Sequence, residues 1–168
     1  MANSFFAPID GSEGWRALLA DPEKHWRTGY SAKSLAYCWE EAQGFPRSVR
    51  AAFEASPYAC FHDLKFVAGF PEHKVYFPPM DARPSQNDLF VLGKGAAGLV
   101  SIAVEGKVAE PFGAPVFEWK VPMTPGKDER LGFLCRLLEI DRGEVDAVRY
   151  QLLHRTASAL IEAERFCA

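Results

Sequence analysis

The sequence predicts one α/β domain over residues 1–168, with N-terminal helices, a central mixed β-sheet and C-terminal helices. Apolar residues recur at helical spacing near both ends of the chain, whereas aromatic and β-branched residues fill its middle. A length of 168 residues fits one compact domain better than two. The expected order is therefore helices, then strands, then helices.

Three helical segments are expected before the sheet. Trp15, Leu18 and Leu19 indicate a short helix that Asp21-Pro22 interrupts. Ser31 fits an N-cap for a helix over about residues 32–43, which Gly44 ends. Its apolar stripe consists of Leu35, Cys38, Trp39 and Ala42. The third helix, shorter than the one over residues 32–43, begins near Pro46 and ends at Ser56-Pro57.

The middle of the chain is predicted to form the sheet. Residues 64–77 are rich in aromatic and β-branched side chains, with interruptions at Gly69 and Pro71. Two further strands are expected over residues 88–92 and 99–104. The glycine-rich segment between them, residues 93–98, suits a hairpin connection.

Two helices are predicted after Gly113. The first covers residues 128–140 and the second covers residues 145–166. One face of the first carries Leu131, Leu134 and Leu138, and one face of the second carries Val148, Leu152, Ala159 and Ala163. Both helices are therefore expected to cover the sheet.

Composition excludes several classes of protein. Hydrophobic residues make up 48% and charged residues 24% of the chain, which argues against disorder and a coiled coil. Nineteen basic residues face 22 acidic ones, giving a net charge of −3. No basic tail of the kind typical of nucleic-acid-binding proteins is present in the sequence.

The cysteines and the N-terminal sequence indicate a cytoplasmic protein without membrane contact. Cys38, Cys60, Cys135 and Cys167 lack both metal-ligand spacing and a disulfide pattern, so reduced thiols are expected. The sequence begins without a charged, apolar leader and contains no run of eighteen apolar residues.

Three charged residues are expected to converge at the ends of two strands. Side chains alternate along a strand, so Glu105 and Lys107 share one face after the strand over residues 99–104. Asp88 opens the neighbouring strand, and a hairpin between the strands brings it toward Glu105. Two acids and a lysine then meet.

Two carboxylates and a lysine suit metal-assisted hydrolysis of a phosphate ester. Asp88 and Glu105 can hold Mg²⁺, or Mn²⁺, and leave positions for water and a phosphate oxygen. The cation would acidify the water, and Lys107 could orient it or neutralise developing charge. The alternative is an ordinary surface ion pair at a strand end, which stabilises a protein little.

The segment from Pro84 to Asp88, followed by a strand that ends in Glu105-Gly106-Lys107, resembles the PD-(D/E)xK nuclease superfamily. This resemblance implies a restriction-endonuclease-like core of a helix, three strands, a helix and a further strand. It also implies that Asp88 and Glu105 are metal ligands and Lys107 is the catalytic lysine. A glutamate on the first core helix often completes such sites, and either Glu40 or Glu41 can fill that role here.

Nearly the whole chain also resembles an uncharacterised family of small bacterial proteins. The resemblance is carried by five segments: residues 29–33, 71–75, 85–88, 104–113 and 149–156. It implies relatives but no activity.

The last predicted helix carries a polar stripe opposite the face of Val148 and Leu152. The stripe consists of Gln151, His154, Arg155, Ser158 and Glu162. It is either a solvated helix face or, if the helix packs as the nuclease resemblance implies, a surface turned toward the site. In the second case Gln151, His154 and Arg155 contact a phosphate of the substrate.

The glycines of residues 93–98 do not indicate a dinucleotide-binding site. Residues 93–98 spell G-x-G-x-x-G, but a strand follows them instead of the helix whose N-terminus binds a pyrophosphate. A hairpin turn explains these glycines better.

The expected function is hydrolysis of phosphodiester bonds in DNA or another nucleic acid by a metal-dependent nuclease. The alternative is a catalytically inactive nuclease-like fold, kept as a binding or regulatory module that acts through a protein partner. The net charge of −3 favours the alternative, because a nuclease must attract phosphates.

Overall fold

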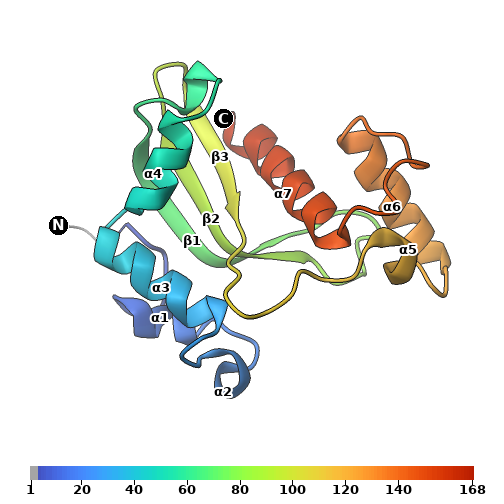
Figure 1. Cartoon of the computed structure of the whole chain (residues 1–168), viewed down its shortest axis with the longest axis horizontal. Helices are drawn as coiled ribbons and strands as arrows, with labels where there is room; N and C mark the ends of the chain where they lie inside the picture. The colour runs from blue at the N-terminus through green and yellow to red at the C-terminus, as the bar shows by residue number, and fades with distance from the viewer. Residues whose placement is uncertain (1–3) are drawn as a thin grey trace.

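A three-stranded sheet lies between helices in the computed structural model, which describes residues 4–168 (Figure 1). The elements are α1 (Ser12–Arg16), α2 (Pro22–His25), α3 (Ser31–Ala42), α4 (Arg47–Glu54), η1 (Ala59–Phe61), β1 (Lys65–Val75), β2 (Ser85–Lys94), β3 (Leu99–Val104), α5 (Val116–Trp119), α6 (Pro125–Leu137) and α7 (Tyr150–Phe166). Helices α3 and α4 lie on one side of the sheet and α7 on the other, while α5 and α6 lie beyond one end of it (Figure 1). The predicted α/β class and the order of elements are confirmed.

The expected mixed sheet is wrong for the three strands that form it. β1 pairs with β2, and β2 pairs with β3, both antiparallel. Short connections explain this arrangement, because a parallel pair needs a longer crossover than residues 76–84 or 95–98 provide. Within the described residues, parallel pairing is limited to an isolated bridge between Phe5 and Gly69 at the β1 edge.

The hairpin between β2 and β3 is confirmed. Gly95 donates a backbone hydrogen bond to the carbonyl oxygen of Gly98 across 2.9 Å. β2 is longer than expected, since it begins at Ser85 instead of Asp88. Asp88 therefore lies within the strand, three residues after its start.

β1 is continuous through Gly69 and Pro71 but has an irregular backbone at Glu72. The φ angle of Glu72 is 54°, in the left-handed region that residues other than glycine rarely adopt. On either side, Pro71 pairs with Leu89 and His73 pairs with Asn87, so Glu72 lies opposite Asp88. The register of the two strands thus places two acidic residues across from each other.

The C-terminal helices begin at positions other than those expected. α6 starts at Pro125 because the Thr124 side chain caps it by accepting a hydrogen bond from the Lys127 amide. α7 starts at Tyr150, not at residue 145. Arg149 is extended and forms a bridge with Pro115, which holds the preceding segment out of the helix.

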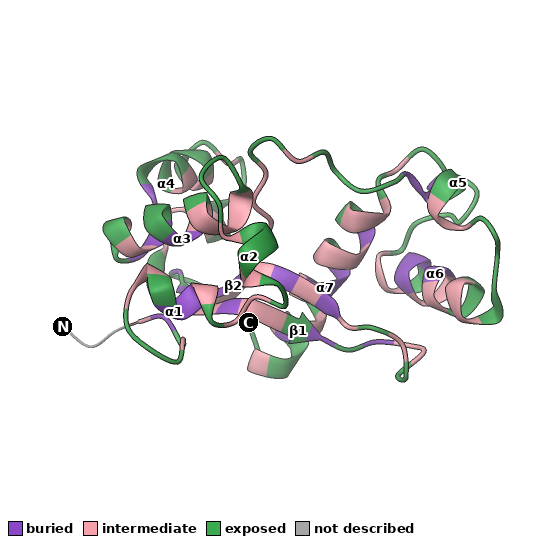
Figure 2. Cartoon of the chain, turned by 90° about the horizontal axis from the view of Figure 1, so that it is seen from below, coloured by how far each residue is buried: buried purple, intermediate pink, exposed green. Residues whose placement is uncertain are grey.

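Two apolar clusters flank the sheet. One joins α1 and α3 to the sheet through Phe5, Trp15, Ala36, Trp39, Phe45, Leu89 and Val91. The other joins α6 and α7 to the start of the β1–β2 connection through Val75, Phe77, Val116, Leu131, Leu134, Cys135, Val145, Leu153 and Ala157. Burying one large apolar side chain contributes roughly 1.5–3 kcal/mol. Figure 2 shows these buried positions on α3, β2, α6 and α7, whereas α2 has none.

The buried face of α7 differs from the predicted one. Leu152 is 46% exposed, and Val148 precedes the helix. The face turned inward carries Leu153, Ala157, Ser158 and Glu162. Two of the five residues of the predicted polar stripe, Ser158 and Glu162, are therefore buried, and the other three are partly buried, which contradicts its interpretation as a solvated face.

Two further features concern the end of the core and the membrane. No strand follows α7 within residues 4–168. None of the helices in this described part of the chain is long and apolar enough to span a membrane.

Candidate functional site

A pocket of about 350 Å³ lies where β2 begins and β3 ends, beside the N-terminus of α3 and the first turns of α7. Four acidic residues line it, together with cationic and amide side chains. The polar lining residues are His25, Ser31, Glu72, Gln86, Asp88, Glu105, Lys107, Glu110, Gln151 and Arg155. We call it the acidic pocket.

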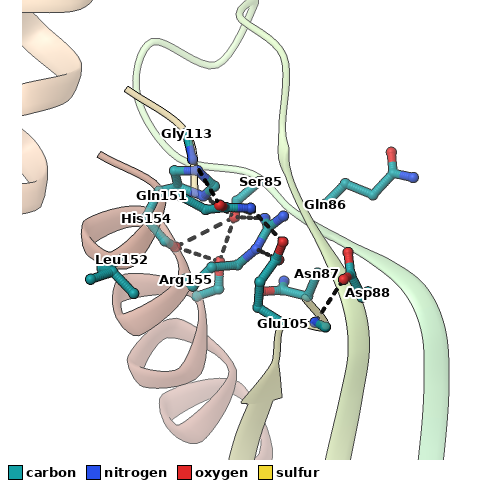
Figure 3. Close-up of polar contacts among 12 residues, drawn as sticks. Ser85, Gln86, Asn87, Asp88, Glu105, Gly113, Gln151, Leu152, His154 and Arg155 are labelled. Atoms are coloured by element: carbon teal, nitrogen blue, oxygen red, sulfur yellow. Dashed lines mark hydrogen bonds and ion pairs between the residues drawn. The ribbon is translucent and has the colours of Figure 1, made fainter. Parts of the chain in front are cut away.

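Glu105 is at the centre of a hydrogen-bond network that joins β3 to α7 (Figure 3). Its Oε1 accepts hydrogen bonds from Lys107 Nζ and Gln151 Nε2. Its Oε2 accepts from Arg155 Nε across 2.6 Å. The expected neighbourhood of Glu105 and Lys107 is present, and α7 supplies two further donors.

These hydrogen bonds leave the Glu105 carboxylate with few free acceptor positions for a further donor or a cation. An ionised carboxylate offers about four acceptor positions, and three are occupied. One lone-pair position on Oε2 remains, because Arg155 is its one donor among the described residues.

Asp88 and Glu72 are held differently. Asp88 Oδ2 accepts a hydrogen bond from the Gly106 amide across 2.9 Å. A Cβ on Gly106 would lie 3.3 Å from Ser31 Cβ, a tight contact, and 3.5 Å from Asp88 Oδ2, an ordinary one. Glu72 Oε2 accepts a hydrogen bond from Gln86 Nε2 across 2.5 Å.

Burial and mutual repulsion raise the pKa values of both acids. Burial is the main cause that raises the pKa of Asp88 to about 6, followed by the negative charge of Glu105. Burial likewise raises the pKa of Glu72 to about 7, against the hydrogen bond from Gln86. Asp88 and Glu105 are thus close enough to repel each other, and near neutral pH the pocket contains carboxyl groups that titrate.

Glu72 was not predicted from the sequence as part of the site. Residues 71–75 entered the sequence analysis only through a family resemblance, and a strand-period pattern gives no reason to expect a left-handed residue there. The one acidic residue in the predicted strand was the available signal. In the structure Glu72 is the third carboxyl group beside Asp88 and Glu105.

The residues predicted on α7 lie at the site. Gln151 and Arg155 line the acidic pocket and bond to Glu105. His154 is beside it, where its Nδ1 lies 2.9 Å from Ser85 Oγ. Burial, together with the positive charges of Arg155 and Arg130, lowers the pKa of His154 to about 3, so its ring is neutral at physiological pH.

Neither glutamate predicted on the first core helix reaches the pocket. Glu40 Oε1 accepts a hydrogen bond from Trp15 Nε1 across 2.8 Å, which ties α3 to α1. Glu41 is exposed. The residues of α3 that line the pocket are Ser31 and Ala32 at its start, because the helix axis carries residues 40 and 41 away.

The arrangement does not form a closed metal centre. Within residues 4–168, no group of three or more His, Cys, Asp or Glu side chains could hold a metal ion. A cation here would depend on two protein carboxylates completed by water or substrate oxygens, which is how proteins commonly hold Mg²⁺.

Fold and pocket define an α/β protein with an acid-rich pocket at one end of an antiparallel sheet. The chain belongs to the family described as a domain of unknown function (DUF6946), whose model matches residues 8–168. No curated protein and no solved structure matches the chain.

Proposed function

We propose that the acidic pocket hydrolyses phosphodiester bonds in nucleic acid with the help of a bound divalent cation, Mg²⁺ or Mn²⁺. The observation that carries this proposal is the meeting of Asp88, Glu105 and Lys107 in one pocket from two neighbouring antiparallel strands. The order of α3, three antiparallel strands and α7 supports the helix, three strands and helix of a PD-(D/E)xK core, whereas the further strand of that core does not follow α7 within residues 4–168.

The donor set suits a hard cation. Asp88 and Glu72 offer carboxylate oxygens, and Glu105 retains one free acceptor position. We assign Asp88 and Glu105 as the two ligands, with Glu72 from β1 as a neighbouring acid that adds negative charge beside them. A cation between these groups would offset their repulsion and favour their ionised forms.

A bound cation would lower the pKa of a coordinated water and polarise the phosphate. Lys107 holds Glu105 in place and can donate the remaining hydrogens of its ammonium group to a substrate oxygen. Arg155 uses Nε for Glu105 and Nη1 for Ser85, so Nη2 has no partner among the described residues. It can therefore donate to a phosphate oxygen.

The test is calorimetric titration of Mg²⁺ and Mn²⁺ into the protein with a short oligonucleotide present, paired with a cleavage assay. Asp88→Asn and Glu105→Gln are expected to lose both cation binding and cleavage. Glu41→Gln is a matched control, since Glu41 is exposed and outside the pocket. Cleavage by the Glu105→Gln variant at the rate of the original protein would rule out the assignment.

A second candidate is a nuclease-like module that binds a protein partner without catalysis. Two observations favour it: Glu105 already has three hydrogen-bond donors, and the chain has a net charge of −3. This candidate predicts that neither cation binds and that no oligonucleotide is cleaved, so the same titration separates the two.

We also propose a cytoplasmic location. The free state of Cys38, Cys60, Cys135 and Cys167 supports it, because reduced thiols persist in that compartment.

A further inference from the structure

A second pocket of about 490 Å³ adjoins the acidic pocket. Lys107, Gln151 and Arg155 line both, so they form a shared wall. The other residues of the second pocket are Pro111, Gly113, Ala114, Trp119, Tyr150 and His154. We call it the Trp119 pocket.

The two pockets differ in charge. Glu72, Asp88, Glu105 and Glu110 line the acidic pocket, whereas the described lining of the Trp119 pocket contains no acidic residue. Its charged residues are Lys107 and Arg155, both at the shared wall. An anionic ligand group is therefore favoured at this wall, on the side that faces the Trp119 pocket.

An aromatic surface lines the same pocket. The rings of Trp119 on α5 and Tyr150 on α7 stack with their centroids 3.8 Å apart and their planes within 9° of parallel. Both residues are only partly buried, and they pack on the apolar cluster of α6 and α7 while contributing to the pocket wall. Tyr150 covers one face of the Trp119 ring, and Lys127 Nζ lies over the ring 5.7 Å from its centroid, so a flat ligand group would contact the remaining surface of rings whose position is already fixed.

Cationic donors beside partly exposed aromatic rings match the two halves of a nucleotide, since a phosphate suits Arg and Lys and a base suits an aromatic side chain. We propose that the Trp119 pocket binds an unpaired nucleotide next to the phosphate that is held at the shared wall. This inference rests on the proposed function and specifies its substrate as single-stranded nucleic acid or an unpaired strand end. Bases inside a duplex are stacked on their neighbours and cannot enter such a pocket without leaving the stack.

Binding can be measured separately from cleavage. Fluorescence anisotropy with EDTA present would compare labelled single-stranded DNA and RNA oligonucleotides with a blunt duplex of the same length. We expect tighter binding of a single strand than of the duplex. Trp119→Ala is expected to weaken single-strand binding by about 5- to 100-fold, and Trp119→Phe, which keeps a ring, to retain most of it.

Phe117→Ala is the matched control, because Phe117 is an exposed aromatic residue on the same helix but does not line the pocket. Equal affinity for single strand and duplex would overturn the inference, as would equal effects of the Trp119→Ala and Phe117→Ala substitutions. In that case the exposed apolar side chains of this region, which include Phe117 and Val121, would be assigned to a protein contact.

Trp119 packs on the core, so its replacement can also disturb folding. Photocrosslinking of the unaltered protein with an oligonucleotide that carries 4-thiothymidine avoids this difficulty. Crosslinks at Trp119 or Tyr150, identified by mass spectrometry, are expected. Crosslinks confined to other regions would contradict the inference.

The two proposals can fail separately. Single-strand binding that depends on Trp119, without cleavage in Mg²⁺ or Mn²⁺, would reject the proposed hydrolysis and retain the nucleotide pocket. The other outcome is cleavage that is abolished by Asp88→Asn, while Trp119→Ala changes neither the affinity for single strands nor the KM. It would retain the proposed hydrolysis and reject the nucleotide pocket.

Discussion

Arg155 on α7 donates a hydrogen bond from Nε to Oε2 of Glu105, across 2.6 Å, and so ties the last helix to the end of β3. The side chains are 14% and 12% exposed, so water screens this ion pair only in part. Arg155 Nη1 also donates to Ser85 Oγ on β2, across 3.0 Å. One guanidinium therefore connects two strands at the edge of the acidic pocket.

Replacing Arg155 with methionine is expected to lower the free energy of unfolding by about 1–3 kcal/mol. The change leaves the Glu105 carboxylate with one charged partner, Lys107, and removes a charge from a largely buried pair. Urea denaturation measures the loss. Adding Glu105→Gln should recover part of it, because the unpaired charge is removed. Strictly additive effects of the two substitutions would contradict coupling through the pair.

The raised pKa values of Asp88 and Glu72 predict that stability decreases as pH rises from 5.5 to 8. Both folded-state pKa values, about 6 and about 7, exceed the ordinary values of 3.8 and 4.5. The folded chain therefore binds more protons than the unfolded chain in this range. The stability that these bound protons contribute is lost as the pH rises through the two folded-state pKa values. The expected decrease is on the order of 2 kcal/mol.

Thermal or urea unfolding across this pH range checks the expected decrease. Glu72→Gln should reduce the slope of stability against pH, and Glu41→Gln should leave it unchanged. Addition of Mg²⁺ or Mn²⁺ should raise stability at pH 8, where the ionised carboxylates bind a cation. A slope that is identical in the Glu72→Gln variant would show that other groups cause the pH dependence.

Much of the fold followed from local patterns. The apolar stripe over residues 32–43 and the glycine-rich hairpin at residues 93–98 depend on near neighbours in the sequence, so periodicity and turn composition located them. The start of α7 could not be located in this way. A backbone bridge from Arg149 to Pro115 sets it, and such a contact has no signature in a short window.

The part of the site that depends on neighbours in the sequence was predicted, and the part that depends on tertiary contacts was not. Glu105 and Lys107 are two residues apart, just after the end of β3, so nearness in the sequence was enough to predict that they meet. Glu72 joins them through an unusual φ angle and the register of β1 on β2. The polar stripe of α7 left two interpretations open, and tertiary packing against the sheet decided between them.

A buried polar pair behind the acidic pocket is expected to support its two strands. Glu162 on α7 is fully buried, and its Oε2 lies 3.3 Å from His73 Nε2. His73 follows Glu72 directly and pairs in register with Asn87, which precedes Asp88. The pair therefore anchors the residues adjacent to two of the four carboxyl groups in the pocket.

Replacing His73 with leucine should lower the free energy of unfolding by about 1–3 kcal/mol, because it removes a polar group beside the buried Glu162 carboxylate and leaves Arg165 as its ion-pair partner. Glu162→Gln should cost less, since it removes the charge and keeps the shape of the side chain. Both variants should weaken cation binding at the acidic pocket. Full retention of cation affinity in a destabilised His73→Leu variant would limit the pair to a role in folding.

Glu72, and not Glu40, is expected to act as the third acid of the site. Glu72 lines the acidic pocket opposite Asp88, whereas Glu40 is engaged with Trp15 outside it. Glu72→Gln should therefore weaken Mn²⁺ binding by about 10-fold or more, equivalent to ~1.4 kcal/mol. Glu40→Gln should leave Mn²⁺ affinity unchanged and affect stability alone, through the weakened hydrogen bond from Trp15. Calorimetry of the two variants at one pH provides the comparison. The reverse order of effects would indicate that α3 approaches the pocket more closely during cation binding than it does here.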